Sequence, residues 1–301
     1  MEENLVSDAT RRLGDETEVG PIGFGCWRLT GTSDAENGRL IATALDLGMN
    51  LIDNADVYGL DWGGTGFGAC EEALGRVLAN DPSLRDQMVL ATKGGIIPGV
   101  PYDSSAAYLV SACEASLRRL GVDFVDLYQI HRPDMFTHPE EIATAFASLR
   151  DRGLVSMFGV SNYTPAQTMA LSAYVEEPLV STQPEFSCAA LSPLRDGTFD
   201  LCIEAGLTPL AWSPLAGGRL ATGDGLHPEL MGVLDELASR EGVTRAAVAI
   251  AFVLAHPADA VALVGTQNAG RLQELADATR VRLSRTDVYR IVVASDGAPL
   301  P

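Results

Sequence analysis

The segments MVLAT (Met88–Thr92) and FVDLYQI (Phe124–Ile130) enclose the segment AAYLVSACEASLRRL (Ala106–Leu120). The two outer segments are short and mostly apolar, which is typical of strands that are buried on both faces of a sheet. The middle segment has the length and pattern of a helix. A strand, a helix and a second strand in this order indicate an α/β protein.

The same alternation continues in both directions along the chain. We expect strands at Pro21–Cys26, Leu51–Asp53, Met88–Thr92, Phe124–Ile130, Ser156–Val160, Val180–Gln183, Thr208–Ala211 and Ala260–Val264. We expect helices at Asp34–Leu47, Cys70–Ala79, Ala106–Leu120, Pro139–Arg152, from Pro165 onward, Phe199–Ala205, Pro228–Arg240, Arg245–Ala255, Ala269–Ala278 and Arg285–Ala294. Two of the helix starts are explicit, because Ser33 with Glu36 forms a capping-box pattern and Thr164 precedes a proline.

Eight strands that are each followed by helical sequence predict a closed (β/α)₈ TIM barrel with an extra C-terminal helix. An open, doubly wound sheet of six strands is the alternative. It is disfavoured because no GxGxxG motif opens a helix directly after a strand; the nearest match, Gly64–Ala69, begins eleven residues past Asp53. No linker or low-complexity tract divides the chain. We therefore expect one domain over residues 1–301, with residues 1–19 as a flexible or hairpin extension.

Charge and cysteine content limit the partners and the compartment of this 301-residue chain. There are 40 acidic and 21 basic residues, and the net charge of −19 argues against nucleic-acid and membrane partners. The longest apolar run, Ala246–Ala255, has ten residues and is too short to span a membrane. The five cysteines lack CxxC spacing and the start of the chain has no export signal, so we expect a cytoplasmic protein with reduced thiols. The four histidines lack metal-ligand spacing, and we expect no metal site.

Lysine usage singles out one position. Lys93 is the only lysine, and the other 20 basic residues are arginines. Arginine cannot substitute for lysine where a site needs a compact ammonium group. The exception therefore indicates a functional amine at Lys93.

Polar side chains stand at the carboxyl ends of the expected strands, where a barrel gathers its catalytic groups. Along the chain these residues are Asp53 with Tyr58 five residues later, Lys93, His131, Ser161 with Asn162, Gln183, and Trp212 with Ser213. An acid, a phenol, an amine and an imidazole at one mouth predict a site that transfers protons.

Six motifs occur in the order and spacing of the aldo-keto reductase superfamily. They are LIDNADVYG (51–59), LATKGG (90–95), QIHRPD (129–134), GVSN (159–162), AWSPLAGGRL (211–220) and VGTQNAGRLQE (264–274). The chain resembles this superfamily from about Gly20 to Ala278, and within it looks most like a group of uncharacterised bacterial oxidoreductases.

The resemblance implies a catalytic tetrad of Asp53, Tyr58, Lys93 and His131. Tyr58 would donate a proton to the alkoxide that forms when hydride reduces a carbonyl group. Lys93 would lower the pKa of that phenol, and Asp53 would keep the ammonium charged and oriented. His131 would polarise the carbonyl oxygen through a hydrogen bond.

The resemblance also implies a nicotinamide dinucleotide. The carboxamide would contact Ser161, Asn162 and Gln183, and the nicotinamide ring would stack on Trp212. The remaining cofactor positions are Cys26, Trp27 and Asp53 near the ring, Ser213, Pro214, Leu215, Gly217 and Arg219 around the pyrophosphate, and Gly265, Thr266, Gln267, Arg271 and Glu274 at the adenosine end.

Two departures from the superfamily bear on cofactor choice. Gly265 stands where NADP-specific members usually carry a basic residue, and Glu274 is followed by Leu275 in place of the usual asparagine. Arg271 alone remains to meet a 2′-phosphate. We expect NADP(H), with NAD(H) as the alternative.

The expected function is NAD(P)H-dependent reduction of aldehydes or ketones. Trp27, Tyr58, Trp62 and His131 are the expected substrate pocket, and the protein is expected to be a monomer or small homo-oligomer. One alternative is a subunit that senses the nicotinamide state with little turnover. Another is a cofactor-free lyase or hydrolase with Lys93 as a Schiff base, which leaves GVSN and AWSPLAGGRL without a role.

Overall fold

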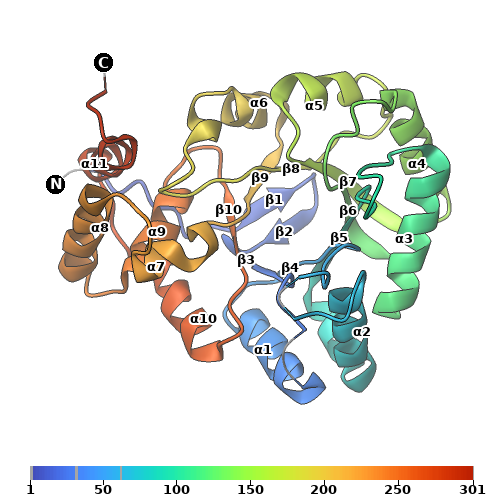
Figure 1. Ribbon diagram of the computed structural model, residues 1–301, viewed down its shortest axis with the longest axis horizontal. Helices are drawn as coiled ribbons and strands as arrows, with labels where there is room; N and C mark the ends of the chain where they lie inside the picture. Colours follow the sequence, from blue (N-terminus) through green and yellow to red (C-terminus); the bar gives the residue numbers. More distant parts are fainter. Residues whose placement is uncertain (1–2, 31–32, 62, 301) are drawn as a thin grey trace.

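Eight parallel strands close into a barrel in the computed structural model, which describes residues 3–30, 33–61 and 63–300 (Figure 1). The barrel strands are β3 (Ile22–Gly25), β4 (Leu51–Asp53), β5 (Val89–Gly94), β6 (Val125–Ile130), β7 (Val155–Ser161), β8 (Ser181–Gln183), β9 (Thr208–Ala211) and β10 (Val261–Val264). Each pairs in parallel with the next along the chain, and β10 pairs with β3 to close the ring. The (β/α)₈ prediction is confirmed, and the doubly wound alternative is excluded.

Helices surround the barrel on its outside (Figure 1). They are α1 (Asp34–Asp46), α2 (Ala69–Asn80), α3 (Ala106–Leu120), α4 (Pro139–Asp151), α5 (Pro165–Ser172), α6 (Thr198–Ala205), α7 (Arg219–Thr222), α8 (Pro228–Glu241), α9 (Arg245–Leu254), α10 (Ala269–Ala276) and α11 (Arg285–Asp296). Short 3₁₀ helices are η1 (Pro82–Gln87), η2 (Ser192–Leu194), η3 (Ala216–Gly218) and η4 (Asp277–Arg280). The extra C-terminal helix is α11, which packs against α8. The expected elements end within two residues of the observed ones, and the sequence missed only α7 and the 3₁₀ helices among the helices described.

The explicit helix starts form as their sequences indicate. The Ser33 hydroxyl accepts a hydrogen bond from the Glu36 amide at 3.3 Å, and the Glu36 carboxylate accepts one from the Ser33 amide at 3.0 Å. Thr164 and Gln167 make the same reciprocal pair at the start of α5. Each cap satisfies backbone donors that have no partner inside the helix, which stabilises it by about 1 kcal/mol.

Within the described part of the expected N-terminal extension, β1 (Arg11–Leu13) and β2 (Thr17–Val19) form a hairpin. Leu13 and Val19 are fully buried against apolar side chains of the barrel strands. The side chain of Asn50, just before β4, donates to the Glu18 carbonyl at 3.1 Å. The hairpin therefore covers the amino ends of the strands and leaves the carboxyl ends as the open mouth.

None of the described helices is both long and apolar enough to cross a membrane.

Candidate active site

The carboxyl ends of β4 and β5 bring three of the predicted site residues into contact. The Lys93 ammonium donates to Asp53 Oδ2 at 2.6 Å and to the Asn54 carbonyl at 2.9 Å. Its third contact is the Tyr58 hydroxyl, at 3.2 Å from Nζ. Lys93 is completely buried and Asp53 is 3% exposed. Every proton of the one lysine in the chain thus has a partner inside the site.

His131 follows β6 and completes the cluster. Its ring lies edge-on to the ring of Tyr58, with centroids 5.6 Å apart. Its backbone amide donates to the Gly94 carbonyl at 2.9 Å, which ties the end of β6 to the end of β5. Nδ1 is buried and has no partner within the described chain.

Burial and charge set the protonation states of these groups. Burial disfavours the ammonium of Lys93, but the charge of Asp53 and contact with Tyr58 outweigh it, so the pKa of Lys93 lies above its ordinary value. Burial, with the positive charges of Lys93 and Arg132, holds the pKa of His131 well below its ordinary value. At neutral pH the site therefore contains an ammonium beside a neutral imidazole.

Lys93 lowers the pKa of Tyr58 as expected, but burial, which the sequence could not show, outweighs it. The Asp53 carboxylate also opposes the phenolate. The pKa of Tyr58 is therefore raised above its ordinary value. Tyr58 is a neutral phenol at physiological pH, which is the form that can donate a proton.

The second oxygen of Asp53 accepts two side-chain amides. Gln183 Nε2 lies 3.1 Å from Oδ1 and Gln129 Nε2 lies 3.3 Å from it. Gln129 was not among the site residues predicted from the sequence. A signal was present, because Gln129 stands two residues before His131 on β6 and strand residues two apart share a face.

Residues after β7 and β9 form the opposite side of the mouth. The Asn162 amide donates to the His131 carbonyl at 3.1 Å and to Ser161 Oγ at 2.9 Å. Its oxygen accepts the indole N–H of Trp212 at 3.1 Å. Asn162 adopts a positive φ of 60°, a conformation that asparagine tolerates better than most residues. One amide thus links three of the predicted site positions.

The loop after β9 is tightly wound. Its positive φ angles are 53° at Ser213, 50° at Ala216, 72° at Gly217 and 101° at Gly218. The Gly217 amide donates to Ser213 Oγ at 3.0 Å, and Arg219 Nε donates to the Ala216 carbonyl at 3.1 Å. Pro214 and Leu215 lie within this turn. Arg28, which the sequence analysis did not select, reaches across from the loop after β3 and lies 3.5 Å from the Gly217 carbonyl.

The loop after β10 shows why one position lacks a side chain. A Cβ atom at Gly265 would lie 3.0 Å from Nε1 of Trp27, so the indole occupies the space that a longer residue would need. Thr266 Oγ1 accepts the Asn268 amide, and Asn268 caps α10 by accepting the Arg271 amide at 3.1 Å. Both polar atoms of the Gln267 side chain are buried without a partner in the described residues. Arg271 and Glu274 are exposed on α10. Orphaned amide atoms beside an open loop fit a nucleotide that hydrogen-bonds there.

Known proteins are similar to this chain along almost its whole length. The model of the Aldo/keto reductase family matches residues 21–296. This chain belongs to the aldo-keto reductase family. It is 46% identical to a 6-dehydroglucose reductase of Novosphingobium aromaticivorans over 297 residues, which cover 97% of each chain. It is 35% identical to the uncharacterized oxidoreductase YcsN of Bacillus subtilis, over 96% of this chain and 99% of that one.

A solved structure gives the same result. The aldo/keto reductase of Klebsiella pneumoniae, in complex with NADP and acetate, superimposes with a TM-score of 0.81 at 25% identity and covers 98% of this chain and 97% of its own. The resemblance to the aldo-keto reductases is thereby confirmed, and the protein is an oxidoreductase of this family.

Two positions expected in this aldo-keto reductase site are not part of the geometry above. Cys26 is fully buried and its backbone amide donates to the Asp53 carbonyl at 2.8 Å, so it lies next to the cluster, and its place in the cofactor site stays a prediction. Trp62, expected in the substrate pocket, lies outside the described residues.

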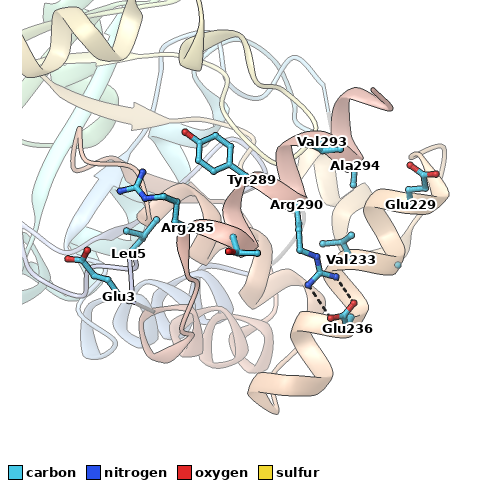
Figure 2. Close-up of a pocket in the computed structure, with 12 residues that line it drawn as sticks. Glu3, Leu5, Glu229, Val233, Glu236, Arg285, Tyr289, Arg290, Val293 and Ala294 are labelled. Carbon is cyan, nitrogen blue, oxygen red and sulfur yellow. Dashed lines mark hydrogen bonds and ion pairs between the residues drawn. The ribbon is translucent and has the colours of Figure 1, made fainter. Parts of the chain in front are cut away.

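A large groove lies on the outer surface of this aldo-keto reductase (Figure 2). Its volume is about 1030 Å³, and the described residues that line it come from α8, α11 and the N-terminal segment. Arg290 and Glu236 form an ion pair at 2.6 Å on one side, and Tyr289 is half exposed within it. Asp53, Tyr58, Lys93 and His131 do not line this groove, so we place the chemistry at the mouth.

Proposed function

We propose that this aldo-keto reductase reduces aldehyde or ketone groups to alcohols, with NADPH as the hydride donor and Tyr58 as the proton donor. The observation that carries the proposal is the contact of the Tyr58 hydroxyl with a buried ammonium, 3.2 Å away, which is itself paired to Asp53 at 2.6 Å. A nicotinamide dinucleotide supplies the hydride when it is bound.

The chain contributes a proton and a place for the substrate oxygen. The ring of Tyr58 lies beside the neutral ring of His131, with centroids 5.6 Å apart, and a carbonyl oxygen placed between these side chains would accept a hydrogen bond from each. As negative charge forms on that oxygen, Tyr58 gives up its proton. The resulting phenolate is stabilised by the ammonium of Lys93, which Asp53 holds in position.

Residues around the mouth would hold the cofactor. Ser161, Asn162 and Gln183 would bind the carboxamide, and Trp212 would stack on the ring. The loop from Ser213 through Pro214, Leu215 and Gly217 to Arg219 would enclose the pyrophosphate, with Arg28 as a second cation. Gly265, Thr266, Gln267, Arg271 and Glu274 would contact the adenosine, and Trp27 would lie between the cofactor and the substrate.

For the substrate, we propose an aldehyde of a sugar. The support is the 46% identity to a 6-dehydroglucose reductase over 97% of both chains. Asp53 and Lys93 are buried beneath Tyr58, so of the four residues of the predicted tetrad only Tyr58 and His131 would contact the carbonyl group.

The test is a panel of aldehydes, ketones and 6-dehydroglucose, offered to the purified protein with NADPH and separately with NADH. We expect NADPH oxidation with an aldehyde, and none with the variant Tyr58→Phe. A protein that binds NADPH tightly and turns over nothing on the panel would be a sensor of nicotinamide state, and the reductase proposal would be wrong.

A further inference from the structure

A buried glutamine in the barrel, Gln129, joins two parts of the active site. It is completely buried on β6, where it pairs with Lys93 of β5 and with Gly159 of β7. Its Nε2 lies 3.3 Å from Asp53 Oδ1, and its Oε1 lies 3.4 Å from Gln183 Nε2. Gln183 itself reaches Asp53 Oδ1 at 3.1 Å. The three side chains therefore form a closed triangle.

The neighbouring strand leaves room for this glutamine. A Cβ atom at Gly159 would lie 2.2 Å from Ser181 Oγ, which it would displace, and 3.4 Å from Gln129 Cγ, so Gly159 lets β8 and the stem of Gln129 pack closely against β7. A buried amide is costly unless its donor and its acceptor both have partners. The Gln129 amide donates to Asp53 and accepts from Gln183. Both its donor and its acceptor therefore have partners, which offsets the cost of burying this polar group.

We propose that Gln129 is a positioning residue that couples the nicotinamide side of the site to the proton-donor side. This inference rests on the proposed function, since Gln183 is the residue assigned there to the carboxamide. Through its donor, Gln129 helps to hold the Asp53 carboxylate whose other oxygen binds Lys93. Through its acceptor, it fixes the direction of the Gln183 amide.

Loss of the amide has two separate consequences. Gln183 loses its bond to Gln129 and is held only by Asp53 Oδ1, so its amide is less firmly oriented and its hold on the nicotinamide weakens. The N–H dipole of Gln129 also points its positive end at the Asp53–Lys93–Tyr58 cluster and favours negative charge there. Without it, Tyr58 holds its proton more tightly, and the loss of activity at alkaline pH moves to higher pH.

The principal variant is Gln129→Met, which keeps the length of the side chain and removes both polar ends. We expect NADPH affinity, measured by fluorescence titration, to fall about three- to tenfold, as for the loss of one neutral hydrogen bond. We expect kcat to fall about tenfold with KM for the aldehyde within twofold, and the alkaline limb of the pH profile to rise by about half a unit. Gln129→Asn, which is too short to span the triangle, should behave in the same way.

Ser181→Ala is the matched control. Its hydroxyl is buried beside Gly159 without a partner in the described chain, and removing it should leave NADPH affinity and the pH profile unchanged. Gln129→Glu tests rescue. Burial and the charge of Asp53 would raise the pKa of the new carboxyl, so at about pH 6 its O–H can replace the lost donor. Activity should therefore approach that of the wild type at pH 6 and fall as the pH rises.

The outcomes separate the two proposals. If the wild type reduces aldehydes and both Gln129→Met and Gln129→Asn keep its NADPH affinity and pH profile, Gln129 is a packing residue and the inference is wrong. If Gln129→Met lowers only the melting temperature, and leaves the NADPH affinity and the alkaline limb of the pH profile unchanged, the same conclusion holds. A wild-type protein that neither binds nicotinamide nor reduces any carbonyl compound contradicts the proposed function itself.

Discussion

At the scale of single residues, the chemistry proposed for the site depends on the proton of the Tyr58 hydroxyl. Tyr58 touches the buried ammonium of Lys93 at 3.2 Å, yet burial keeps the pKa of the phenol above its ordinary value. The lysine therefore serves to limit the rise in the pKa of Tyr58 that burial causes. Its stabilising effect is greatest on the phenolate, which is formed only after the proton has moved.

The variant Tyr58→Phe tests the proton donor directly. It removes the hydroxyl and keeps the ring, so NADPH affinity should stay within a few-fold of the wild type. We expect kcat for carbonyl reduction to fall by about 10²–10⁴, the usual contribution of general acid catalysis. Steady-state kinetics at neutral pH measure this. Retention of more than about a tenth of the wild-type kcat would assign the proton to another group.

Lys93→Arg keeps the positive charge and changes its shape. Lys93 is fully enclosed by Asp53, the Asn54 carbonyl and Tyr58, and a planar guanidinium does not fit a space built for a compact ammonium. We expect activity as low as that of Lys93→Met, measured with saturating NADPH. If the arginine variant were instead nearly as active as the wild type, the single lysine in the chain would be incidental.

The pH profile of reduction follows from the directions of the pKa shifts. His131 is neutral at neutral pH because its pKa is lowered, and the raised pKa values of Tyr58 and Lys93 keep both protonated. Between pH 6 and 8 kcat should therefore be flat. It should fall only on the alkaline side, above about pH 10, where Tyr58 begins to lose the proton it must donate. An alkaline limb near pH 7 would contradict this assignment.

At the scale of elements, we propose that the loop after β10 and the start of α10 determine the choice between NADPH and NADH. Trp27 occupies the space beside Gly265, and Arg271 is exposed on the first turn of α10. A single arginine can make charge-assisted hydrogen bonds to a 2′-phosphate, each worth about 1.5–3 kcal/mol. The net charge of −19 opposes that anion. We therefore expect a modest preference for NADPH.

We expect the wild type to bind NADPH roughly ten- to hundredfold more tightly than NADH, and Arg271→Ala to bind the two about equally. The preference should shrink as salt is added, since exposed charges are screened. Fluorescence titrations of both cofactors at two salt concentrations measure this. Equal weakening of both cofactors in Arg271→Ala would mean that the residue holds the adenine or the loop.

At the scale of the whole molecule, the two ends of the barrel differ in composition: one end is apolar and the other is polar. The β1–β2 hairpin fills the amino end with Leu13 and Val19, and the polar groups occupy the carboxyl end. Among the described residues, no group of three or more His, Cys, Asp or Glu side chains is arranged to hold a metal ion. Stability and chemistry should therefore be separable by mutation.

Leu13→Ala tests that separation. Truncation of a fully buried leucine leaves a cavity, and we expect the free energy of unfolding to fall by about 2–5 kcal/mol. Chemical denaturation measures the loss. The kcat of the folded variant should stay within about twofold of the wild type, because the hairpin lies at the far end of the barrel from Tyr58. A large loss of kcat would show that the hairpin supports the site.

Local sequence determined the barrel and most of its site. Apolar runs of strand length, capping residues such as Ser33 and Thr164, and polar residues at strand ends are properties of neighbours along the chain, so they are readable without a structure. This is why Asp53, Lys93 and His131 could be selected and placed at one mouth. The single lysine added a compositional signal that needed no geometry.

Tertiary structure alone decided what these residues do to each other. The triangle of Asp53, Gln129 and Gln183 joins positions up to 130 residues apart, and it depends on strand register. The raised pKa of Tyr58 depends on how much of the molecule packs over it. The absence of a side chain at position 265 is explained by the indole of Trp27, which occupies the space next to Gly265. Burial and contact across the barrel are sums over distant segments, and no local pattern in the chain records them.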